Sequence, residues 1–65
     1  MRLIHCATVK SRLLEIFKIE YPEGAVLPGR LNYKVSMNGV TIGTTQKPEQ
    51  AKDIYNDTIN SIKEV

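Results

Sequence analysis

The side chains with the most reactive chemistry are neighbours near the start of the sequence, at His5 and Cys6. A thiol beside an imidazole is the pair that activates a cysteine nucleophile. Adjacent residues cannot form this pair, because they point to opposite faces of a strand and diverge by about 100° on a helix. We therefore expect an ordinary histidine and a partly buried thiol, unless another chain supplies one member of a pair.

The remaining reactive groups do not form a catalytic pattern. We interpret Glu15, Glu20 and Glu23 as solvated surface charges rather than as an acid–base cluster. The glycines lack the GxxxxGK spacing and the strand-to-helix context of a phosphate loop. One cysteine and one histidine cannot make an intramolecular disulfide or a four-ligand zinc site. The sequence predicts a protein that is not an enzyme and has no catalytic residues, metal or small-molecule cofactor.

The length and charge of the chain limit its architecture and its partners. Residues 1–65 are enough for one small domain, which buries only about 60% of its unfolded surface and is marginally stable. The net charge of +2 is spread along the chain, so nucleic acid is permitted as a partner but not required. No apolar run reaches about 18 residues, so we expect no membrane span. A single cysteine favours the cytoplasm.

The clearest element is a β-hairpin over residues 32–45, NYKVSMNGVTIGTT. Asn38-Gly39 between two alternating runs is a strong hairpin signal, and a two-residue turn fixes the register. One side of the expected hairpin is largely apolar, with the pairs Met37–Val40, Val35–Ile42 and Tyr33–Thr44. The other side is polar, with the pairs Ser36–Thr41, Lys34–Gly43 and Asn32–Thr45. Gly43 would let another backbone approach the polar side closely.

Residues 48–65 have the period of an amphipathic helix. The expected buried stripe spans an arc of roughly 140° and consists of Ala51, Ile54, Tyr55, Thr58, Ile59, Ile62 and Val65. Pro48 suits the first helical position, and Glu49 favours the positive end of the helix dipole. The sequence therefore predicts a helix that covers one face of the hairpin.

The segment over residues 8–20, TVKSRLLEIFKIE, predicts a second helix, because its apolar side chains lie mainly on one side of a helical wheel. A strand remains the alternative, since the segment is rich in β-forming residues. Its alternation is poor, because Leu14 and Ile16 would point away from Leu13 and Phe17.

These elements together predict an α+β fold. A small two- or three-stranded antiparallel sheet, built on the hairpin 32–45, is packed on one face by the helix 48–65 and the N-terminal helix 8–20. Residues 24–31 are the candidate for the third strand of this sheet. An isolated hairpin is marginal in water, so both helices would share its apolar side.

The polar side of the hairpin then faces solvent, as one face of an antiparallel sheet commonly does. It also suits a nucleic acid, because hydroxyl and amide groups bond phosphates or base edges and cations supply charge. The candidate binding residues are Arg30, Asn32, Lys34, Ser36, Thr41, Thr45, Lys47 and Lys52. The alternative is a small regulatory or inhibitor protein that binds another protein, or a second copy of itself, through an edge strand or a helix face.

From Tyr33 to Asn56 the chain reads YKVSMNGVTIGTTQKPEQAKDIYN. This resembles the AP2-type DNA-binding module and the related arm-binding domains of integrases. The matching positions are Tyr33, Val35, Asn38, Gly39, Ile42, Gly43, Glu49, Ala51, Tyr55 and Asn56.

The AP2-type resemblance implies three strands before the helix and a sheet that grips DNA with Arg and Trp, of which this chain has a counterpart only in Lys34. An α-β-β-β-α order would instead resemble the double-stranded RNA-binding fold. That resemblance implies that Lys47 and Lys52 lie near a phosphate-holding helix start.

Overall fold

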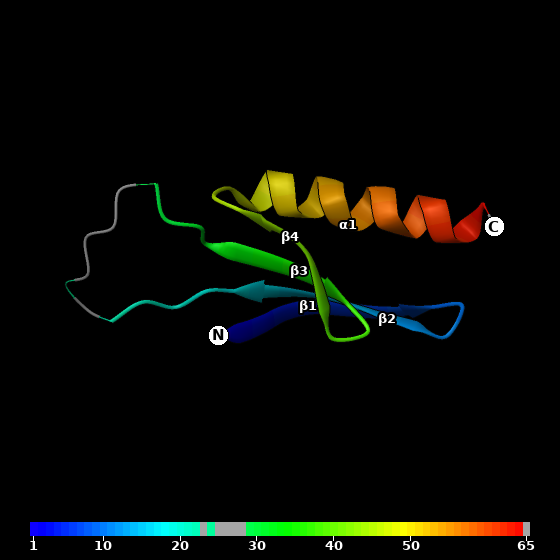
Figure 1. Ribbon diagram of the computed structural model, residues 1–65, viewed down its shortest axis with the longest axis horizontal. Coiled ribbons are helices and arrows are strands. Elements are labelled where there is room, and N and C mark those ends of the chain that lie inside the picture. Colours follow the sequence, from blue (N-terminus) through cyan, green and yellow to red (C-terminus); the bar gives the residue numbers. More distant parts are fainter. Residues whose placement is uncertain (23, 25–28, 65) are drawn as a thin grey trace.

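The computed structural model describes residues 1–22, 24 and 29–64. Within these residues the chain forms β1 (Arg2–Val9), β2 (Arg12–Lys18), β3 (Tyr33–Met37), β4 (Val40–Thr45) and α1 (Pro48–Lys63). The strands make one antiparallel sheet in the order β1-β2-β3-β4, and α1 lies along one face of it (Figure 1). The α+β class is confirmed, but the sheet has four strands rather than two or three.

The helix expected over residues 8–20 is wrong, because these residues form the end of β1, a tight turn and β2. The turn residues Lys10 and Ser11 have φ angles of 48° and 66°. Positive φ at both central residues is the signature of a type I′ turn, whose twist matches that of a hairpin. Lys and Ser rarely adopt this conformation, so the sequence carried no turn signal at this point.

Apolar side chains on both faces of β2 concealed its strand period. Leu14 and Ile16 are buried under α1, with exposed fractions of 0% and 4%. Leu13 and Phe17 point to the opposite face, because successive side chains of a strand alternate. A strand that is apolar on both faces lacks the alternation that distinguishes it from a helix.

The turn at Asn38-Gly39 is confirmed, with φ angles of 51° and 83°. It also joins the two hairpins. The Asn38 backbone N–H donates to the Leu13 carbonyl at 2.8 Å, and the Asn38 side-chain oxygen accepts from the Leu13 N–H at 2.9 Å. Asn38 therefore fixes the register between β2 and β3 as well as closing its own turn.

The expected register of the β3–β4 hairpin holds only beside the turn. Met37 pairs with Val40 and Ser36 with Thr41, but a bulge at Ile42 then shifts the pairing by one residue. Beyond the bulge the expected pairs are wrong. Val35 lies opposite Gly43, Lys34 opposite Thr44 and Tyr33 opposite Thr45.

The bulge turns Gly43 toward α1 rather than toward the polar side. A Cβ atom at Gly43 would lie 2.8 Å from Ile54 Cδ1, so a side chain there would collide with the helix. Gly43 therefore permits the close approach of α1 of the same chain, rather than of another backbone on the polar side.

The core lies between α1 and the sheet and comprises Leu14, Ile16, Val35, Ala51, Tyr55 and Ile62. The predicted stripe of α1 is confirmed at Ala51, Tyr55 and Ile62, which are buried, and Ile54 and Ile59 pack beside the core. The helix ends at Lys63, and Val65 lies outside the described residues. In the described part of the chain, no helix is long and apolar enough to cross a membrane.

Two expectations concern the segment between β2 and β3. The optional strand over residues 24–31 falls largely on residues 25–28, and these lie outside the described residues, as does Glu23. Leu31, which is described, belongs to no strand and is 40% exposed.

Candidate nucleic-acid interface

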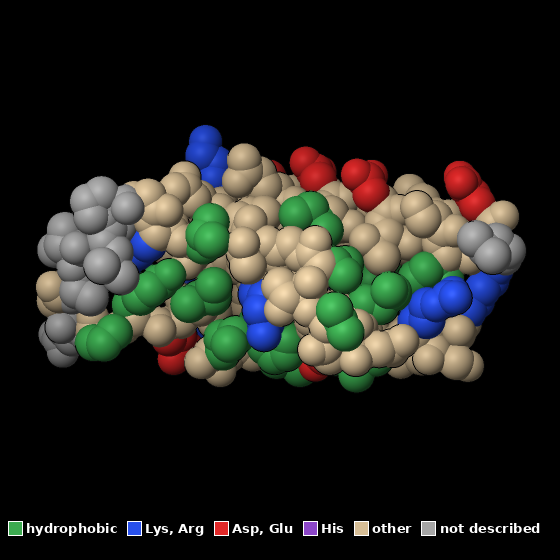
Figure 2. All heavy atoms as spheres, viewed as in Figure 1, with side chains coloured by type: hydrophobic (Ala, Val, Ile, Leu, Met, Phe, Trp, Pro, Cys, Tyr) green, Lys and Arg blue, Asp and Glu red, His purple; other side chains and the backbone are tan. Residues whose placement is uncertain are grey.

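We call the side of the sheet that α1 leaves uncovered the open face. The strand register places its side chains in rows across the sheet, of which two adjacent rows cross all four strands, and Thr8 and Leu13 form a shorter row beside them. One row is Cys6, Glu15, Ser36 and Thr41, and the next is Leu3, Phe17, Lys34 and Thr44. In the view of Figure 2, hydrophobic side chains gather over the strands, whereas acidic side chains line the outer side of α1.

An aromatic residue lies in the open face, beside the polar side chains that the hairpin was expected to place there. Phe17 projects from β2 beside Lys34 of β3, and the Lys34 Nζ atom lies 5.1 Å from the centre of the Phe17 ring. Both side chains are half-buried. A cation above an aromatic face is held by the ring quadrupole, so the ring gives the ammonium a preferred position on the sheet.

Of the hairpin residues predicted to bind, Lys34, Ser36 and Thr41 lie on the open face. Thr41 is exposed, and so is Thr44, which the register shift brings to this face. Ser36 is only 2% exposed, and its hydroxyl is buried without a hydrogen-bond partner among the described residues. Ser36 is therefore corrected from a contact residue to a buried one.

Thr45 does not lie on the open face, and both Thr45 and Asn32 hydrogen-bond to the segment that joins β4 to α1. The bulge at Ile42 turns Thr45 toward α1, where it is 7% exposed and its hydroxyl donates to the Lys47 carbonyl at 3.0 Å. The Asn32 side-chain amide donates to the Gln46 carbonyl at 3.0 Å. Both bonds hold the chain between β4 and α1, so the Thr45 hydroxyl proton and one N–H of the Asn32 amide are already in use.

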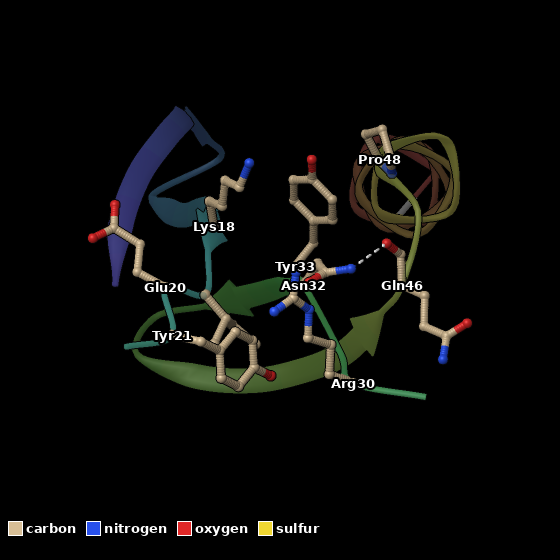
Figure 3. A pocket seen from close by; sticks show the side chains of 9 residues that line it. Lys18, Glu20, Tyr21, Arg30, Asn32, Tyr33, Gln46 and Pro48 are labelled. Carbon is tan, nitrogen blue, oxygen red and sulfur yellow. Dashed lines mark hydrogen bonds between the residues drawn. The ribbon is translucent and has the colours of Figure 1, made fainter. Parts of the chain in front are cut away.

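A pocket of about 510 Å³ opens at the end of the sheet where β2 ends and β3 begins. Its lining residues are Lys18, Ile19, Glu20, Tyr21, Arg30, Asn32, Tyr33, Gln46 and Pro48. Figure 3 shows Tyr21 and Arg30 on one side of it, and Tyr33 and Pro48 on the other. We call it the sheet-end pocket.

Cations and tyrosines meet in the sheet-end pocket. The Arg30 guanidinium lies 5.2 Å from the centre of the Tyr21 ring, and the Tyr21 hydroxyl donates to the Leu31 carbonyl at 2.5 Å. Arg30 was predicted from the sequence. Lys18 was not among the predicted binding residues, since residues 8–20 were expected to form a helix rather than a strand of the sheet.

Lys47 and Lys52 do not join the open face. Lys47 directly precedes α1, and Lys52 projects from its second turn. Lys52 lines a groove of about 330 Å³ between β1 and α1, together with Ile4, His5, Ile16, Tyr33, Pro48, Ala51, Tyr55 and Asn56. The predicted cations therefore occupy three separate places rather than one patch.

His5 and Cys6 point to opposite faces of β1. The His5 ring packs edge-on against the Tyr55 ring, with 5.1 Å between their centres. Burial raises the pKa of Tyr55, and coulombic repulsion from the nearby Cys6 thiol group in its ionised form acts in the same direction. Cys6 is exposed on the open face, so the expectation of a partly buried thiol is wrong. Among the described residues, no three His, Cys, Asp or Glu side chains gather to hold a metal ion.

Comparison with known proteins found no matching family model, no similar curated protein and no similar solved structure. Any functional assignment therefore depends on the arrangement of the side chains themselves.

Proposed function

We propose that this protein is a non-catalytic nucleic-acid-binding module that lays the open face of its sheet against duplex DNA. Element order supports the proposal. An N-terminal helix would have differed from the AP2-type pattern, which has three strands before its helix. Residues 8–20 form no such helix, and β2, β3 and β4 are three antiparallel strands that precede α1. Strand β1 is an addition to that pattern.

One observation carries the proposal: the Lys34 ammonium lies over the Phe17 ring in the middle of the uncovered sheet. The cation would contact phosphate, while the hydroxyls of Thr41 and Thr44 on the next strand would bond phosphate or base edges. A β-ribbon fits the major groove of B-DNA. The half-buried carboxylate of Glu15 in the neighbouring row would accept from a cytosine amino group.

The charge of the molecule limits the strength of this binding. Lys34 is the cation of the two central rows, and Glu15 lies in the row beside it. Lys18 and Arg30 of the sheet-end pocket supply further positive charge beyond the ends of β2 and β3. With so few cations, we expect dissociation constants in the non-specific range of about 10⁻⁴–10⁻⁶ M and a modest salt dependence, with a slope of about one for each phosphate contact.

The test is a titration of labelled duplex DNA, duplex RNA and single strands at low and moderate salt. We expect duplex DNA to bind best. Lys34→Gln should weaken its binding about fivefold to tenfold and lower the salt slope by about one. Lys63→Gln is the matched control, because it removes the same charge from the last turn of α1.

Two results would contradict the proposal. One is the absence of duplex binding at low salt. The other is an equal loss for Lys34→Gln and Lys63→Gln, since this would mean that net charge rather than the open face governs binding. Stronger binding to duplex RNA would keep the open face as the interface but replace DNA as the ligand.

A further inference from the structure

The free edge of β1 is a second surface with a definite chemistry. β1 is the outermost strand of the sheet and pairs on one side with β2. Its other side presents backbone N–H and C=O groups to which no strand of the described residues is paired. We propose that β1 pairs antiparallel with β1 of a second copy of this chain, so that two sheets join into one. This proposal is independent of nucleic-acid binding.

The residues of β1 do little to prevent such pairing. Natural edge strands are protected by charged side chains, proline, bulges or short length. β1 runs over Arg2–Val9, RLIHCATV, with Arg2 as its one Lys, Arg, Asp or Glu and with no proline. A bulge does occur at Ile4, but it lies near the start of the strand, and the pairing with β2 is regular from His5 to Val9.

Large apolar side chains are exposed beside this edge. Leu3 and Ile4 have exposed fractions of 47% and 46%, and Ile4 also lines the apolar groove between β1 and α1. One of these side chains lies on the open face and the other beside α1. A partner strand would therefore cover apolar surface on both faces of the sheet, in addition to satisfying the backbone groups.

A second copy is the partner that fits these features. A core of this size rarely supplies more than about 3–5 kcal/mol, so surface buried against a second copy would add a large share of the stability. The described residues contain neither a disulfide nor a metal cluster. The segment from His5 to Val9 has no Lys, Arg, Asp or Glu, so two copies can pair antiparallel without charge repulsion inside the paired segment.

Pairing centred on Ala7 uses the whole regular segment. It places His5 opposite the partner's Val9 and Cys6 opposite the partner's Thr8. The twofold axis is then perpendicular to the sheet, so both α1 helices lie on the same side. The open faces of the two copies would also lie side by side.

The other edge of the sheet is less suited to pairing. β4 covers Val40–Thr45, which is shorter than β1, and its bulge lies at Ile42 in the middle of the strand. A central bulge interrupts the ladder and increases the twist of the edge. Val40 is nevertheless 66% exposed, which makes it a suitable control position for β1.

The test measures the mass of the full chain by sedimentation velocity over a range of concentrations, for the wild type, Ile4→Lys and Val40→Lys. In the paired register Ile4 lies opposite the partner's Lys10, so a new ammonium there should repel the second copy. We expect the wild type and Val40→Lys to dimerise and Ile4→Lys to remain monomeric. Circular dichroism shows whether each variant is folded.

Backbone hydrogen exchange of the wild type tests the same interface without a substitution. The N–H groups of β1 that point away from β2 should exchange more slowly as the protein concentration rises, while those of β4 should not change. Three outcomes would overturn the proposal: a wild type that stays monomeric up to about 1 mM, a dimer lost in Val40→Lys but kept in Ile4→Lys, or protection that appears in β4 instead of β1.

Discussion

The most sharply constrained single position is Gly43, because α1 lies directly over it. We predict that Gly43→Ala lowers the free energy of unfolding by about 1 kcal/mol, the low end of the cost of overpacking. The new Cβ would lie 2.8 Å from Ile54 Cδ1, but that atom ends a flexible side chain that can rotate away. Urea denaturation of both proteins measures the difference.

A second substitution separates this collision from other effects of alanine. Ile54→Val removes Cδ1 and should cost about 0.5–1.5 kcal/mol by itself. Because it removes the colliding atom, Gly43→Ala should cost less in the Ile54→Val background than in the wild type. Additive losses in the double variant would show that the contact between Gly43 and Ile54 does not limit the packing of α1 on β4.

Among the elements, the two hairpins use the same turn geometry with different residues. Asn38-Gly39 closes one and Lys10-Ser11 closes the other, and all four φ angles are positive. A left-handed conformation costs a residue with a side chain roughly 1–2 kcal/mol, whereas glycine adopts it freely. The turn between β1 and β2 places two poorly suited residues in this conformation, whereas the turn between β3 and β4 uses glycine and Asn38, and asparagine tolerates positive φ better than most residues.

This difference predicts opposite effects for two reciprocal substitutions. Ser11→Gly should raise the free energy of unfolding by about 1 kcal/mol, and Gly39→Ser should lower it by a similar amount. A Cβ at Gly39 meets no atom within 4 Å, so its cost would come from the backbone alone. Thermal denaturation of the two variants measures both effects. A loss of stability in Ser11→Gly would mean that the serine side chain stabilises the turn more than its backbone strains it.

The elements that the sequence predicted correctly are those with a local signal. The hairpin at Asn38-Gly39 has a turn that only certain residues favour, and α1 has a clear helical period over four turns of chain. β1 and β2 have neither signal, because their turn uses Lys10-Ser11 and because β2 is apolar on both faces. Propensity alone could not decide between helix and strand for residues 8–20.

The same difference between local signals and longer-range structure explains which residues of the candidate site were predicted correctly. Thr41 was placed correctly, because it lies between the turn and the bulge, where the two-residue turn fixes the register. The face of Lys34 was also predicted correctly, because the bulge is in β4 and leaves the alternation of β3 unbroken, although its partner is Thr44 rather than Gly43. Thr45 was misplaced, because it lies beyond the bulge at Ile42, and no residue pattern in the β4 sequence signals that bulge. Phe17 was missed on the open face because its strand was missed.

At the scale of the whole molecule, the fold leaves much surface uncovered. A single helix covers part of one face of the sheet, and the molecule extends over 44 × 17 × 15 Å. Its accessible surface of 4553 Å² is about a tenth larger than the roughly 4200 Å² expected for a compact protein of this mass. Such a molecule gains more than a compact one from burying surface against a partner.

Dimerisation through β1 would make the stability of the folded chain depend on its concentration. A partner that binds the folded state and not the unfolded state raises the unfolding temperature by mass action. We therefore predict that the midpoint of thermal unfolding rises with concentration for the wild type and for Val40→Lys, but stays constant for Ile4→Lys. Circular dichroism at several concentrations measures the midpoint. If the midpoint of the wild type were also constant, the core of Leu14, Ile16, Val35 and the α1 stripe would be sufficient to keep a single copy folded, and the free edge would contribute nothing to its stability.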